Sequence, residues 1–332
     1  MGLVRRREEK WQYLDKIQFI RNFMEQGYEM EKLVGESQIE IEQTENDQEA
    51  LNLLTEDLFE AIRKCNESDQ ERFTVLLPAG RAAEKLFVIL RDRLSEIDFS
   101  KVHFIQAEQL WPIPKDHPVS LLGGMEKALL EGGISEENIH EFDSEAENEE
   151  DATREVQEAL CFGIDYAIAG LNASGAIAGL RDGEEFRTKH IDMVNLDLKS
   201  ELISRDDLGM TDLPYRPMEE LVRLMYEKYW PNDPENGPAR MFAPGWKYMI
   251  EARKLAILGT GASKKEAIQV ALANTGVEIP IKDPENNLID VIMAGKRDID
   301  DQKRHLTSTG EIALSRRKNQ LPTKIYTDYP IK

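Results

Sequence analysis

Short apolar segments alternate with amphipathic helical segments along this chain, and this alternation narrows the possible folds more than any other feature. Runs of strand length occur at Phe73–Leu77, Lys101–Ile105 and Ile164–Ala169. Asp47–Arg63 and Ala82–Leu94, which flank the first of these runs, carry apolar residues at helical spacing. Strands that alternate with helices in this way are typical of βαβ units, whose strands are parallel. The sequence therefore predicts an α/β fold with a parallel sheet.

Other parts of the chain add strands to this pattern. Apolar or alternating residues predict strands at Ser37–Gln43, Ile139–Phe142, His190–Leu196, Leu255–Gly259 and Ile289–Ala294. The tail from Asp298 onward is polar, and we expect it to pack loosely.

We expect the rest of the fold to be organised around the stretch Gly163–Gly183. The apolar run at its start is followed by Gly170 and by the small-residue turn Asn172–Gly175. Glycines allow the backbone to approach a ligand closely, and ligands of open α/β sheets bind beyond the carboxyl ends of the strands. An ordinary connection between a strand and a turn explains the same pattern, so both interpretations remain open.

Charge and composition exclude several classes of function. The chain has 332 residues and a formal charge of -21, which argues against nucleic acid or an anionic membrane as partners. Its two cysteines, Cys65 and Cys161, fit no metal-binding spacing and suggest a reducing, cytoplasmic setting. The acidic run Ser144–Asp151 is better explained as a solvated loop than as a metal site. We therefore expect neither a metal nor a cofactor.

The chain is predicted to comprise two parts. Residues 1–35 form an N-terminal helical extension, and residues 36–332 form the α/β domain, with a helical insertion at 213–238 between proline-rich flanks. Apolar residues recur at helical spacing between residues 8 and 33. That helix either packs on its own domain or acts as a docking arm in a homo-oligomer.

Four motifs occur in the order in which a known family has them. They are DFSKVHFI followed by DHPVS, then GGISEENIH, then GIDYAIAGLNASGAIAG, and finally MIEARKLAILGTGASKKEAI. Together they resemble the glucosamine-6-phosphate deaminase and 6-phosphogluconolactonase group of sugar-phosphate enzymes, over roughly residues 37–294. The resemblance implies a doubly wound, mostly parallel, Rossmann-like sheet with the site at the carboxyl ends of its strands.

The resemblance also implies residues that bind the phosphate of a sugar. In the loop after the second strand, Gly80 is retained, but Arg81 replaces the family's hydroxyl residue. Arg205 matches the arginine of a Ser-Arg pair, and Lys264 matches the lysine of a Gly-Thr-Gly-x-x-Lys helix start. Cations and backbone N–H groups that converge in this way suit a phosphomonoester. Each cation can instead be a solvated charge or part of a surface salt bridge.

The acid–base residues of the family are replaced at their positions. Ala107 stands where the deaminases have an aspartate, although the neighbouring Glu108 is retained. In the central turn, Ser174 and Ala176 stand where the family has aspartate and histidine, and Arg181 falls near the position of a glutamate. Alanine cannot transfer protons, and serine needs a base of its own. The usual catalytic set is therefore absent from its places, while Ser174 remains a candidate for substrate binding.

Three functions follow from this mixture of retained and lost residues. The first is a phosphosugar-binding or regulatory member of the family that lacks catalysis, in effect a pseudoenzyme of carbohydrate metabolism. Alternatively, it is an isomerase, deaminase or lactonase with a rebuilt set such as Glu108, Asp182 or Glu184, and His190, although a lone histidine is usually structural. A third possibility is an assembly protein whose former site is filled. The retained cations favour the binding protein.

Overall fold

The structure is a computed structural model. It describes residues 39–78, 81–111, 115, 123–171, 177, 191–195, 240–261, 264, 267–268, 278–282, 288–293, 312–313, 316 and 319–329. The predicted N-terminal extension (1–35) and the predicted insertion (213–238) lie outside these residues. Among the described helices, none is both long enough and apolar enough to cross a membrane.

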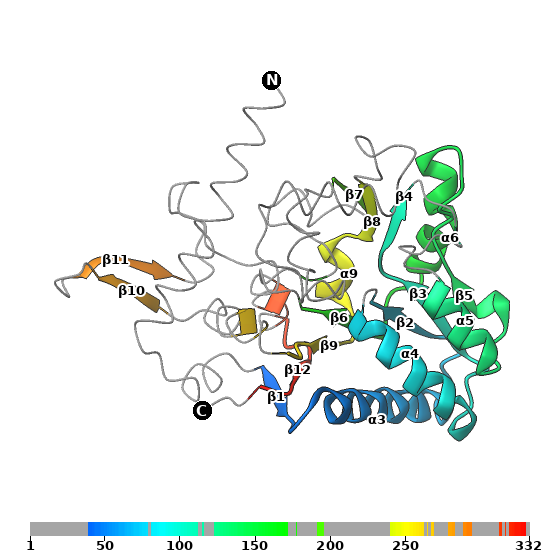
Figure 1. The fold of residues 1–332 in the computed structure, drawn as a ribbon, viewed down its shortest axis with the longest axis horizontal. Coiled ribbons are helices and arrows are strands. Elements are labelled where there is room, and N and C mark those ends of the chain that lie inside the picture. Colours follow the sequence, from blue (N-terminus) through cyan, green and yellow to red (C-terminus); the bar gives the residue numbers. More distant parts are fainter. Residues whose placement is uncertain are drawn as a thin grey trace, which may run out of the picture.

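A seven-stranded sheet forms the centre of the fold (Figure 1), in the order β1-β12-β9-β6-β2-β3-β5. Its strands are β1 (Glu40–Gln43), β2 (Phe73–Leu77), β3 (Val102–Gln106), β5 (Ile139–His140), β6 (Tyr166–Gly170), β9 (Lys254–Leu258) and β12 (Thr323–Thr327). Every neighbouring pair in this sheet is parallel. The predicted parallel α/β sheet is therefore confirmed.

Helices cover both faces of this sheet. On one face lie α3 (Asp47–Asn66), α4 (Arg81–Arg93) and α5 (Gly123–Glu131), and on the other lie α6 (Glu149–Leu160) and α9 (Trp246–Glu251). Short 3₁₀ turns at Leu94–Glu96 and Glu136–Asn138 follow α4 and precede β5. Successive strand residues point to opposite faces, so Leu76 joins the core beside α6 while Val75 and Leu77 join the core beside α3 and α4. The sheet is thus doubly wound, as the resemblance implied.

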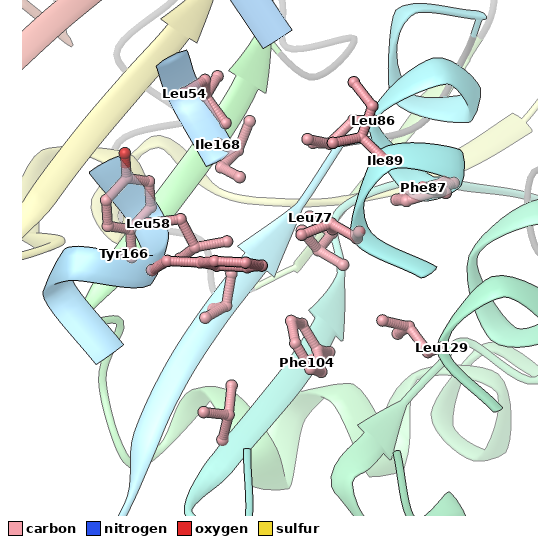
Figure 2. Packing of buried hydrophobic residues seen from close by; sticks show 14 of the residues in the cluster. Leu54, Leu58, Leu77, Leu86, Phe87, Ile89, Phe104, Leu129, Tyr166 and Ile168 are labelled. Carbon is pink, nitrogen blue, oxygen red and sulfur yellow. The ribbon is translucent and has the colours of Figure 1, made fainter. Parts of the chain in front are cut away.

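Helix α3 shows how local sequence and packing agree. The Asn46 side chain accepts a hydrogen bond from the Glu49 N–H (2.9 Å), and the Glu49 carboxylate accepts one from the Glu45 N–H (2.8 Å). The first bond satisfies an N–H group that the first turn leaves free, and the second ties the residue before the N-cap to the start of the helix. One stripe of the helix is buried against the sheet, and Figure 2 shows Leu54 and Leu58 from this stripe beside strand residues such as Tyr166.

A second sheet lies beside the end of β3. It has three antiparallel strands in the order β4-β8-β7, which are Gln109–Trp111, Arg240–Pro244 and Ile191–Asn195. Phe242 of β8 packs at a tilt against Trp111 (ring centroids 5.6 Å apart) and stacks with Phe142 (5.5 Å), which fixes this sheet to the core beside α6. A separate antiparallel pair is formed by β10 (Glu278–Lys282) and β11 (Leu288–Met293).

The predicted loose tail is wrong for residues 319–329. Strand β12 is an inner strand of the main sheet, between β9 and β1, and Ile325 and Tyr326 are fully buried. The segment was missed because TKIYT is short and mostly polar, whereas inner parallel strands usually form continuous apolar runs. Strands β4, β8 and β10 were also not predicted.

A buried arginine holds β12 against α9. Arg316 is fully buried, and burial lowers the pKa of its guanidinium to about 10. Among the described residues its hydrogen-bond partners are all uncharged: the carbonyls of Met249, Ile250, Ala252 and Pro322 and the hydroxyl of Thr323, at 2.5–3.2 Å. Three of these carbonyls belong to the end of α9, where carbonyl groups lack partners within the helix. Arg316 therefore caps α9 and anchors the segment that leads into β12.

We expect Arg316→Met to destabilise the fold by about 3–5 kcal/mol, because it leaves several buried carbonyls without donors. Urea unfolding at neutral pH measures the change. Arg154→Met is the matched control, since Arg154 is exposed on α6 and pairs only with Asp151 among the described residues. Its unfolding midpoint should stay close to that of the parent protein. Equal midpoints for the two variants would contradict the structural role given to Arg316.

Candidate functional site

The order of the strands reverses at one place in the main sheet. From β2 the chain continues through β3 to β5 at one edge, whereas from β6 it continues through β9 to β12 in the opposite direction. The reversal therefore lies between β2 and β6, which are neighbours. Ligands of doubly wound sheets bind beyond the carboxyl ends of the strands at such a switch point. This topology selects the loops after β2 and β6 as the centre of the candidate site.

The carboxyl edge around this point is held together by backbone hydrogen bonds. The Leu171 N–H donates to the Leu258 carbonyl (2.9 Å), and the Ala107 N–H donates to the Leu77 carbonyl (2.9 Å). Leu171 also forms an isolated antiparallel bridge with Ile177. The residues just beyond the strands thus continue the ladder of the sheet and give the loops a firm base.

The loop after β9 approaches the end of β6 closely. A Cβ atom at Gly259 would lie 3.0 Å from Cδ1 of Ile268 and 3.4 Å from a methyl group of Leu171, so a side chain there would force its neighbours to shift. Gly261, two residues later, has a φ of 91°, a conformation that favours glycine. The Lys264 N–H donates to the Gly261 carbonyl (3.0 Å), which closes a turn that contains Lys264.

Asp328, the residue that follows β12, also belongs to this loop. Its carboxylate accepts a hydrogen bond from the Gly261 N–H at 2.7 Å. Asp328 was not predicted as a site residue, because its strand β12 was not predicted and no sequence signal links two segments 67 residues apart. Identifying the strand would have been enough to place Asp328 at the carboxyl edge.

Glu108 lies after β3 at the same edge. Its side chain is half-buried, and burial raises the pKa of its carboxyl from 4.5 to about 7. Among the described residues, no hydrogen bond or charge offsets that shift. The preceding residue, Ala107, is fully buried in the apolar core. The edge therefore offers a carboxyl that can exchange protons near neutral pH, beside a position filled by a methyl group.

The structure describes only some of the predicted site residues. It places Glu108 after β3, Lys264 after β9, and the backbone of Arg81 at the start of α4, directly after β2. All three positions are at the carboxyl edge. Since neighbouring strands are about 4.8 Å apart, the ends of β3 and β9, three strands apart in the sheet, are separated by about 14 Å. The side chain of Arg81 and the residues Gly80, Ser174, Asp182, Glu184, His190 and Arg205 lie outside the described part.

Another group of titratable residues lies on the face of β3 and β5 that is covered by α6. His103 and His140 stack with ring centroids 5.3 Å apart, and Arg72 Nη2 lies 3.4 Å from the His140 ring. Burial, together with the nearby Arg72 charge, lowers the pKa of His103 to about 4. Because His103 precedes the carboxyl end of β3 by several residues on the face covered by α6, this pair is not part of the candidate site.

Comparisons with known proteins agree with this architecture. Residues 45–173 match the sequence model of the family described as glucosamine-6-phosphate isomerases/6-phosphogluconolactonase. Comparison of the sequence with curated proteins gives no significant match.

Solved structures of two kinds of enzyme share the fold. A monomeric glucosamine-6-phosphate deaminase has a TM-score of 0.59 at 13% identity, covering 88% of this chain and 98% of its own. The 6-phosphogluconolactonase of Trypanosoma brucei has a TM-score of 0.56 at 15% identity, with coverages of 88% and 97%. That of Thermotoga maritima has a TM-score of 0.53 at 15% identity, with coverages of 71% and 90%.

The resemblance to this group of sugar-phosphate enzymes is thereby confirmed, and so is the doubly wound fold that it implied. At these identities the solved structures establish the fold, and activity has to be argued from the site itself.

The raised pKa of Glu108 predicts a pH-dependent stability. Well below pH 4.5 the carboxyl is protonated in both the folded and the unfolded state. Between pH 4.5 and about 7 the unfolded state loses this proton first, so folding stability falls as the pH rises. We expect Glu108→Gln, which stays neutral, to match the parent protein at pH 4.5 and to exceed its free energy of unfolding by about 1–3 kcal/mol at pH 7.5.

Urea unfolding of both proteins across this pH range measures the difference, in which the contributions of all other groups cancel. Glu71→Gln, at an exposed glutamate before β2, is the control and should show no such divergence. A constant difference between parent and Glu108→Gln at every pH would refute the raised pKa.

Proposed function

We propose that this protein binds a phosphorylated sugar at the carboxyl edge of its main sheet and does not catalyse the reactions of the enzymes it resembles. The observation that carries the proposal is the switch point between β2 and β6, beside which the Gly261–Lys264 turn lies. Two of the predicted phosphate-binding positions lie shortly after strands of the main sheet: Arg81 follows β2, and Lys264 follows β9. Family resemblance adds Gly80, Ser174 and Arg205 to the proposed site.

Charge and backbone geometry support an anionic ligand. A protein with a net charge of -21 repels anions on average, so cations at one edge would provide a local exception. Arginine and lysine form charge-assisted hydrogen bonds with phosphate oxygens, and backbone N–H groups in turns add further donors. The expectations of a cytoplasmic location and of a homo-oligomer built through residues 1–35 stay predictions.

The case against ordinary catalysis rests on Ala107. In the resemblance this position carries the proton-shuttling aspartate, and here its side chain is a methyl group in the apolar core. A carboxylate placed there would be strongly desolvated. Ser174 and Ala176 at the other acid–base positions point the same way.

A specific observation favours a second function. Glu108 has a pKa near the working pH of a general acid or base, which an isomerase, deaminase or lactonase with a rebuilt catalytic set would need. Against this, the end of β3 lies about 14 Å from the end of β9, so Glu108 reaches a sugar only if the ligand extends along the edge. Activity measurements decide between the two functions.

We expect purified protein to show no deamination of glucosamine 6-phosphate and no hydrolysis of 6-phosphogluconolactone above background. General acid–base groups contribute about 10²–10⁴-fold each, so the loss of several leaves almost no rate. Release of ammonia and loss of the lactone are the two measurements. Turnover that disappears in Glu108→Gln would establish the rebuilt enzyme instead.

We expect titration calorimetry to detect glucosamine 6-phosphate at micromolar to millimolar affinity and to detect no binding of glucosamine itself. Lys264→Ala should weaken binding by about tenfold to a hundredfold, because a hydrogen bond to a charged group contributes about 1.5–3 kcal/mol. Lys127→Ala is the control, since Lys127 is exposed on α5. If no hexose phosphate binds or raises the melting temperature at millimolar concentration, the protein is not a phosphosugar-binding protein, and the assembly function takes its place.

A further inference from the structure

The loop proposed to bind phosphate already holds an anionic oxygen. The Gly261 N–H donates to Oδ1 of Asp328 at 2.7 Å, a distance typical of a charge-assisted hydrogen bond. Gly261 follows the end of β9 by three residues and has a positive φ. Its carbonyl accepts the hydrogen bond from the Lys264 N–H. The contact demonstrates that this N–H is oriented toward an acceptor beyond the strands and that an oxygen anion fits there.

The position of Asp328 is fixed by the sheet. The preceding residue, Thr327, is buried, and its carbonyl accepts hydrogen bonds from the N–H (2.9 Å) and the hydroxyl (3.1 Å) of Thr44. Its own hydroxyl accepts one from the Tyr329 N–H (3.1 Å). On the other side of β12, the Gly259 N–H donates to the Tyr326 carbonyl (2.9 Å). Strand β12 lies between β9 and β1 (Figure 1), so Asp328 follows a strand whose backbone is hydrogen-bonded on both edges.

A ligand phosphate at this turn meets the carboxylate directly. It has to displace Asp328 from the Gly261 N–H or bind within a few ångströms of a second negative charge. Two like charges about 4 Å apart repel each other strongly enough at a protein surface to change an affinity by about tenfold to several hundredfold. One side chain thus decides how well the turn accepts an anion.

The geometry points to Asp328 as an internal competitor for the phosphate group of the ligand, and hence as the residue that sets the affinity of this site for phosphate. This inference rests on the proposed function, because it concerns the same phosphate. Asp328 would then determine which anions bind. Ligands that carry only a phosphate group bind weakly, because nothing else compensates for the displacement of Asp328. A sugar phosphate binds when the contacts of its sugar outweigh the cost of that displacement.

Two substitutions at Asp328 distinguish the effect of its negative charge from that of its hydrogen-bond acceptor. Asp328→Asn keeps a carbonyl oxygen that can accept the Gly261 N–H but removes the negative charge, and Asp328→Ala removes both. Asp98→Asn is the matched control: Asp98 also accepts a backbone N–H, from Ser100 at 2.9 Å, and its loss changes the net charge equally, but it precedes β3 at the other end of the strand. Affinities for inorganic phosphate and for glucosamine 6-phosphate are measured by calorimetry at one ionic strength, below the melting temperature of every variant.

We expect Asp328→Asn to bind both ligands between about tenfold and about a hundredfold more tightly than the parent protein. Asp98→Asn should remain within about twofold of the parent. A gain in Asp328→Asn or Asp328→Ala supports the competition, and it does so even if binding by the parent protein is too weak to measure.

Two results would overturn the inference, and they differ in what they imply. If the parent protein binds glucosamine 6-phosphate and neither Asp328 variant binds more tightly, the competition is refuted while the proposed function stands. If neither the parent protein nor any variant binds phosphate or the sugar phosphate, the proposed function fails and the inference falls with it.

Discussion

The insertion of β12 between β9 and β1 is the interaction that joins β1 to the main sheet and brings the end of the chain to its carboxyl edge. Strand β1 has β12 as its neighbour in the sheet, and the two are joined by residues 283 positions apart in the chain. Closing so long a loop costs entropy before any contact is made, so the pairing needs strong local support. The buried Ile325 and Tyr326 and the network around Arg316 provide that support on both sides of β12.

The same insertion shapes the candidate site. Because all seven strands are parallel, their carboxyl ends meet at one edge, and the residues beyond them are tied together by backbone hydrogen bonds. Loops on such a framework can change their chemistry while the framework is kept. The buried methyl group of Ala107 beside Glu108 and the carboxylate that Asp328 brings to the Gly261 N–H are two such features of this edge.

Two carboxyl groups at this edge differ in their surroundings. Glu108 is half-buried and has no described partner, so its pKa rises toward neutrality, whereas Asp328 accepts a backbone N–H at the edge of the sheet. Burial favours the protonated form of the Glu108 carboxyl, which has no hydrogen-bond partner among the described residues. The first environment suits proton exchange, and the second suits competition with an anion. The proposed binding function and its enzymatic alternative therefore depend on different residues.

The sequence by itself determined the α/β class, most of the parallel strands and the positions of the helices α3 and α4, because their apolar residues recur with clear periods. Through the family resemblance it also indicated Glu108 and Lys264, which lie beyond the ends of β3 and β9. Only the tertiary structure decided that the polar segment Thr323–Thr327 is an inner strand, since its burial comes from its neighbours and not from its own composition. The contact of Asp328 with Gly261 was likewise decided by tertiary structure, because a hydrogen bond between the ends of two strands depends on their order in the sheet, which no local pattern encodes.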